Sequence, residues 1–150
     1  MLGMLGILRK TYTVELCPEV HGRISKDGTP IENLLIERSL TYADEEYSDN
    51  CLTNADGEFH FDKKSIKSRL PGNIFHEPVV RQVIEFTLSN HKEETYIWAT
   101  NQHDISCPEI CKLHLRNLVS DISNEEQVYE LANVEAPAYP LIIRALCALK

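Results

Sequence analysis

The sequence predicts an all-β fold, a sandwich built from short strands that are joined by tight turns. Apolar and polar residues alternate over residues 11–16 and 59–61, which is the pattern of a strand with one buried face. Two pairs, Asp27-Gly28 and Asp56-Gly57, favour turns because glycine tolerates a positive φ angle and aspartate hydrogen-bonds to its own backbone. Short strands with turn signals at this spacing are typical of a β-sandwich.

In the first half of the chain, strands are predicted over residues 11–16, 20–24 and 34–36, and the alternating aromatics of 59–61 predict a fourth. Pro71-Gly72 forces a turn and opens an irregular loop that ends at Pro78. The predicted hydrophobic core comprises Val20, Ile24, Leu35, Phe59, Phe61, Val83, Phe86 and Trp98.

In the second half, residues 79–88 predict a long strand and 96–98 a short one, with the polar residues 90–94 as the turn of a hairpin. Ser106 and Pro108 predict the start of a short helix. Leu113 and Leu115 alternate with Lys112, His114 and Arg116, which favours a strand after this short helix. Pro137 and Pro140 exclude a long terminal helix.

The size of the chain fits one domain. Its 150 residues and 17.1 kDa suffice to bury a core without disulfide or metal staples. We expect a single domain over 1–150, with a β-sandwich at about 11–100 and an irregular C-terminal extension at about 101–150 packed on it. The count of five cysteines is odd, so at least one thiol stays unpaired, as expected in a reducing compartment.

The net charge limits the classes of partner that the chain is expected to bind. The net charge of −8 repels phosphate backbones, and the one basic cluster, residues 63–69, is too short to suggest nucleic-acid binding. No apolar run is long enough for a membrane span. Residues 1–8 are apolar or glycine, but the basic residues follow them instead of preceding them, unlike a signal peptide. The expected location is the cytoplasm, with the periplasm as the alternative.

Four segments resemble the transthyretin-like, or carboxypeptidase-regulatory-like, β-sandwich, an Ig-like architecture. They are VHGRI at 20–24, DGTPI at 27–31, NLLI at 33–36 and TNADGEFHF at 53–61. LCPEV at 16–20, RSLTY at 38–42, KSIKSR at 64–69 and FHEP at 75–78 are further similar to an uncharacterised family of small bacterial proteins with such a core. This resemblance implies a non-catalytic accessory or binding module and no catalytic residues.

Two segments are predicted as a protein-binding surface. Residues 42–62 hold seven acidic side chains and no lysine or arginine, which suits a basic partner. The loop at 69–78 is the second surface. The candidate partner-binding residues are Tyr42, Asp44, Glu45, Glu46, Tyr47, Asp49, Arg69, Phe75, His76 and Glu77. The leading hypothesis is a non-enzymatic module, an immunity protein or inhibitor of a basic bacterial toxin; exposed edge strands are also able to pair two copies of the chain.

Two alternatives stay open. A ligand-binding accessory domain of the cell envelope would stack a glycan or peptide on Tyr96 and Trp98 of an exposed strand. A metal- or thiol-dependent enzyme would use the segment that contains His103, Cys107, Cys111 and His114. Thiolate and imidazole suit zinc, but this spacing is wider than the knuckles of structural zinc sites, and no cofactor is predicted. Pairing Cys51 with His60, or Cys17 with His76, for nucleophilic catalysis has no local signature.

Overall fold

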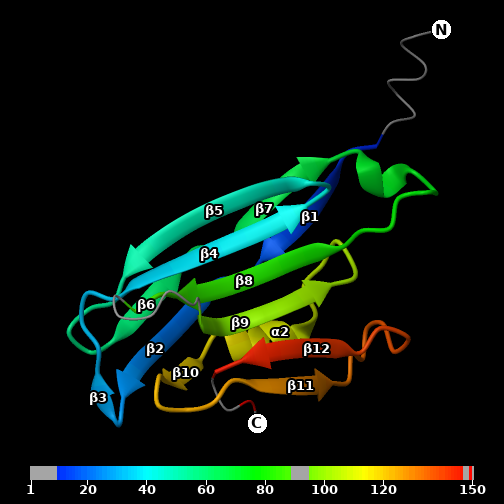
Figure 1. Ribbon diagram of the computed structural model, residues 1–150. Coiled ribbons are helices and arrows are strands. Elements are labelled where there is room, and N and C mark those ends of the chain that lie inside the picture. Colours follow the sequence, from blue (N-terminus) through cyan, green and yellow to red (C-terminus); the bar gives the residue numbers. More distant parts are fainter. Residues whose placement is uncertain (1–9, 89–94, 147–148, 150) are drawn as a thin grey trace, which may run out of the picture.

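The computed structural model describes residues 10–88, 95–146 and 149, and it is an all-β sandwich with one short α-helix (Figure 1). The strands of the first half are β1 (Tyr12–Cys17), β2 (Val20–Lys26), β3 (Thr29–Pro30), β4 (Leu35–Tyr42), β5 (Glu45–Leu52), β6 (Glu58–Phe61) and β7 (Lys64–Ser68). Then follow the 3₁₀ turn η1 (Leu70–Gly72), β8 (Val80–Phe86), β9 (Thr95–Gln102), α2 (Glu109–Leu115), β10 (Leu118–Asp121), β11 (Gln127–Leu131) and β12 (Leu141–Ala145).

One layer is a six-stranded antiparallel sheet in the order β11-β12-β9-β8-β4-β5. It forms the front face in Figure 1, with β5 at one edge and β11 at the other. Strand β5 pairs with β4 along its whole length, from Tyr42 opposite Glu45 to Leu35 opposite Leu52. Residues 45–52 of the acidic segment therefore form an edge strand.

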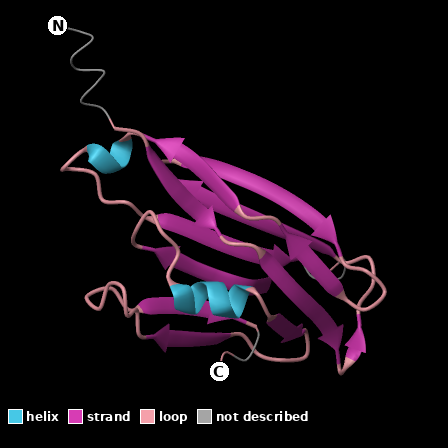
Figure 2. Ribbon diagram, turned by 180° about the vertical axis from the view of Figure 1, so that it is seen from behind, coloured by secondary structure: helices cyan, strands magenta, loops and turns pink. Residues whose placement is uncertain are grey.

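The second layer consists of two ladders of paired strands, one continuing the other along the layer after a short break. Strand β1 pairs with β7, and β2 pairs with β6, both antiparallel; β10 joins the other edge of β2 in parallel. Pro18 and Glu19 separate β1 from β2, directly across from Asp62 and Lys63, which separate β6 from β7. Proline cannot donate to a ladder, so the pairing is interrupted at this point. Helix α2 lies on the same side of the large sheet as this layer (Figure 2).

Of the eight residues predicted for the core, six belong to the buried cluster between the layers, and Val83, outside that cluster, is also buried. The exception is Leu35, which is 42% exposed and lies opposite exposed Leu52. Side chains alternate along β4, and its inward positions are Ile36, Arg38, Leu40 and Tyr42. A run of three apolar residues cannot reveal which of them points inward, and the prediction for Leu35 was wrong for this reason.

A buried polar network joins the two layers. Gln82 of β8 donates through Nε2 to the carbonyl of Leu16 in β1 at 3.0 Å and accepts from Trp98 Nε1 at 3.2 Å. Gln102 of β9 donates to the carbonyl of Glu15 at 2.9 Å. These bonds satisfy polar groups that would otherwise be costly inside the core.

The segment after residue 101 is more regular than predicted, because it contains α2 and strands β10, β11 and β12. The short helix follows Pro108 as expected, but Leu113 and Leu115 belong to it and not to a strand, and Ser106 makes no side-chain cap. The antiparallel hairpin of β8 and β9 is confirmed. The expectations for residues 1–8 and for the turn at 90–94 lie outside the described residues. No helix of the described part has the length and apolarity to cross a membrane.

Candidate functional site

The structure brings the two predicted partner-binding segments together at one end of the sandwich. Tyr42, the last residue of β4, is hydrogen-bonded through its hydroxyl to His76 Nε2 at 2.7 Å, and the two rings meet edge to face. Tyr42 also lies opposite Val80 in the ladder with β8. The turn at Ala43-Asp44 is thus held beside the loop that precedes β8.

The joined segments present apolar and acidic side chains to solvent. Ile74 is 88% and Phe75 89% exposed at the tip of the loop, and Asp44, Glu45 and Glu46 are exposed in the turn and at the start of β5. We name these five residues the acidic end. Large apolar side chains this exposed are typical of protein-binding patches, and the turn with the three carboxylates lies beside this loop.

Two residues predicted for the interface serve the fold instead. Tyr42 is 2% exposed and belongs to the hydrophobic core. Asp49 accepts two hydrogen bonds from Arg38, Nε to Oδ1 at 2.8 Å and a second nitrogen to Oδ2 at 2.6 Å. Arg38 is 2% exposed and also donates to the carbonyl of Asp62. The charge of Asp49 is therefore compensated within the molecule.

The remaining predicted residues belong to the acidic end or lie in the same two segments. Tyr47 is half-buried and donates its hydroxyl to Glu45 at 2.9 Å, which raises the pKa of the phenol. Glu46 accepts from Ser48 and Ser39, and these bonds lower the pKa of its carboxyl. Arg69 and Glu77 are exposed in the loop.

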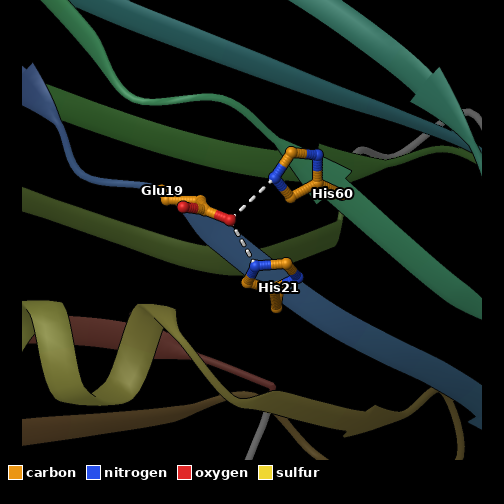
Figure 3. Close-up of side chains that lie close together, drawn as sticks. All are labelled: Glu19, His21 and His60. Carbon is orange, nitrogen blue, oxygen red and sulfur yellow. Dashed lines mark hydrogen bonds and ion pairs between the residues drawn. The ribbon is translucent and has the colours of Figure 1, made fainter.

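A second cluster lies in the other layer, and sequence reasoning missed it. Glu19 Oε1 contacts His21 Nε2 at 2.5 Å and His60 Nε2 at 3.1 Å, and one ligand atom from each residue lies within 4.8 Å of the others (Figure 3). Asp62 Oδ1 is 3.7 Å from His60 Nε2. Hydrogen bonds from His21, and then from His60, lower the pKa of the Glu19 carboxyl. We name Glu19, His21 and His60 the Glu–His triad.

The triad results from strand pairing. His21 of β2 lies directly opposite His60 of β6, and Glu19 is two residues before His21, so all three side chains project from the outer face. The next outward pair is Arg23 and Glu58, joined by an ion pair of 2.8 Å. Both histidines line an open groove of about 580 Å³ that β10 and the end of β5 also border.

The residues weighed as a zinc site from sequence do not converge. Three or more metal-capable side chains meet only in the Glu–His triad, as far as the described residues extend. His103 is exposed and stacks on the ring of Tyr139, while Cys107 and Cys111 are buried in the core. His114 lies on α2, where burial lowers the pKa of its imidazole.

The thiols weighed as nucleophiles lie in unfavourable environments. Burial raises the pKa of Cys17 to about 12, and His76 is engaged with Tyr42. Burial also raises the pKa of Cys51, whose possible partner His60 points to Glu19. A high pKa leaves little thiolate at neutral pH, which disfavours nucleophilic catalysis by either cysteine.

Residues 20–125 match the family described as a domain of unknown function (DUF6795). The chain belongs to this family. The DUF6795 region contains His21, His60 and the whole acidic end, and Glu19 stands one residue before it. Comparisons with curated proteins and with solved structures found no match.

Proposed function

We propose that this DUF6795 protein is a non-enzymatic protein-binding module, an immunity protein or inhibitor that captures a basic bacterial toxin at its acidic end. The observation that carries the proposal is the bond between Tyr42 and His76. It joins an acidic turn to a loop with two solvent-facing apolar side chains. The resemblance of residues 20–61 to transthyretin-like sandwiches supports the same reading, since such domains are mostly binding modules.

The charged and the apolar residues of the acidic end would have different roles in binding. Asp44, Glu45 and Glu46 would accelerate the encounter with a basic protein, because surface charges act on the association rate at low ionic strength. Ile74 and Phe75 would supply the desolvated contact that slows dissociation. Strand β5 adds an exposed edge next to this patch.

The glycan-binding alternative has less support. Trp98 is fully buried and donates to Gln82, so it offers no stacking surface to a sugar. Tyr96 is partly exposed, but its ring lies under the Arg144 guanidinium at 6.0 Å.

The test is affinity capture from lysate of the source cells, followed by binding kinetics with the captured protein. The bait is wild type or the charge-reversal variant Asp44→Lys/Glu45→Lys/Glu46→Lys. The proposal expects a basic partner whose association rate falls by about 10–100-fold in the variant at low salt, and by much less at high salt. Ile74→Ala/Phe75→Ala should instead raise the dissociation rate about tenfold.

The matched control reverses three exposed carboxylates elsewhere, in Glu32→Lys/Glu125→Lys/Glu130→Lys. It changes the net charge equally but leaves the acidic end intact, so its association rate should stay near that of wild type. A partner that binds both charge-reversal variants and wild type with the same kinetics would refute the assignment of this surface.

A further inference from the structure

The Glu–His triad has the composition and arrangement of a transition-metal site. We propose that it binds one divalent first-row transition-metal ion, with zinc as the reference ion, through Glu19 Oε1, His21 Nε2 and His60 Nε2. This site is separate from the acidic end and does not depend on the proposed partner.

The donor set selects the class of ion. Two imidazole nitrogens and one carboxylate oxygen suit zinc, iron, cobalt, nickel and copper, whereas calcium and magnesium prefer all-oxygen ligands. Asp62 Oδ1 lies 3.7 Å from His60 Nε2 but outside the group of ligand atoms that lie within 4.8 Å of one another, so it adds negative charge beside the site and leaves the fourth position to water. All four side chains are partly or largely exposed, from 44% for His60 to 94% for Asp62, so an ion has free access.

The distances agree with this assignment. Ligand bonds of 2.0–2.2 Å in a tetrahedron place neighbouring donor atoms about 3.4 Å apart. Glu19 Oε1 and His60 Nε2 are already 3.1 Å apart. Glu19 Oε1 and His21 Nε2, at 2.5 Å, would separate by about 1 Å, which exposed side chains can do by small rotations.

The backbone holds the donors in place before any ion arrives. His21 and His60 come from directly opposed positions of one ladder, and their ring centroids are 4.6 Å apart. Glu19 follows Pro18, a buried residue with restricted backbone, at the break between β1 and β2. A site preorganised on strands requires less ordering on binding than one on a loop.

The charges around the Glu–His triad also bear on whether a cation can bind there. Arg23 is the nearest cation along the outer face of β2, and its charge is compensated by Glu58 at 2.8 Å. The ion would therefore meet the Glu19 carboxylate with the charge of Arg23 already compensated, and Arg116 is the other arginine that lines the groove. Figure 3 shows Glu19 between the two rings, with its oxygen directed at both.

The experiment is titration of the full-length protein, first stripped with chelator, with zinc chloride in a calorimeter. We expect one equivalent to bind to wild type. The variants His60→Ala and Glu19→Gln should lose at least about 100-fold in affinity, since even the loss of a residue outside the ligand set costs 10–100-fold. The control is His103→Ala, which removes an exposed histidine outside the triad and should bind zinc as wild type does.

Cobalt(II) then distinguishes the triad from the cysteines. Binding through nitrogen and oxygen donors gives d–d bands without the intense near-ultraviolet band of a cobalt–thiolate bond. Imidazole NMR resonances of His21 and His60 should shift on zinc addition, and those of His103 should not. No zinc binding by wild type, unchanged affinity in His21→Ala/His60→Ala, or a thiolate band would each overturn the proposal. None of these outcomes bears on partner capture by the acidic end.

Discussion

The first prediction concerns Asp49, a carboxylate that belongs to the acidic strand but neutralises a buried arginine. Arg38 is 2% exposed, and the Asp49→Ala change would leave its guanidinium in the core with the Asp62 carbonyl, the Cys17 thiol and the face of Phe61 as partners but no carboxylate. Removing one member of a buried pair costs about 3–5 kcal/mol. Asp49 itself is 47% exposed, so water can reach the guanidinium and the lower end, about 3 kcal/mol, applies.

The assay is urea unfolding followed by tryptophan fluorescence, since Trp98 is fully buried. With a slope of about 2 kcal/mol per M, the Asp49→Ala midpoint should fall by about 1.5 M. Glu46→Ala, an exposed carboxylate of the same strand, should cost less than about 0.5 kcal/mol. Arg38→Met/Asp49→Ala should recover most of the loss because no charge stays buried. An Asp49→Ala midpoint no lower than that of Glu46→Ala would refute the reasoning.

Three other perturbations test the fold. Hydrogen bonds from the backbone of Ser123, and then of Gly28, lower the pKa of Asp121 to about 2, below its ordinary 3.8. The free energy of unfolding should therefore fall as the pH drops from 5 toward 2. Urea midpoints measured over this range should show that the Asp121→Asn variant lacks this part of the fall. Gly57 has φ +74° and an added Cβ would lie 2.3 Å from the Ile24 carbonyl oxygen, so Gly57→Ala should lower Tm by about 4–8 °C, more than Gly28→Ala, where φ is +83° but the space is open. Cys17, with its pKa raised to about 12 by burial, should resist iodoacetamide at pH 8 in the native protein and react after unfolding, as mass spectrometry would show.

Most of the fold could be predicted from short-range sequence patterns. The turns at Asp27-Gly28 and Gly57 were predictable because positive φ angles favour glycine and aspartate, and the structure has them there. Strand β5 escaped prediction because exposed edge strands show no alternation between apolar and polar residues. Helix α2 was predicted as strand beyond Lys112 because a helix of seven residues is too short for its period to stand out.

The candidate sites, too, could be predicted from the sequence only in part. The acidity of residues 44–46 was readable from composition, but Ile74 was not among the predicted residues. The roles of Tyr42 and Asp49 depend on contacts with His76 and Arg38, which are distant in sequence. The Glu–His triad needed the pairing of β2 with β6, and 39 positions separate His21 from His60. Glu-x-His at 19–21 and His-x-Asp at 60–62 were the available signal, because residues two apart share a face of a strand.

The acidic end and the Glu–His triad should act independently, for a geometric reason. Strand β5 begins at the acidic end with Glu45, and its last residue, Leu52, lines the groove of the triad. Seven steps along an extended strand span about 23 Å. The Debye length at physiological ionic strength is about 8 Å, so the charge of a bound ion is largely screened over that distance. Zinc at the triad should therefore change the association rate of a basic partner by less than about twofold, and a larger effect would require a rearrangement of β5 itself.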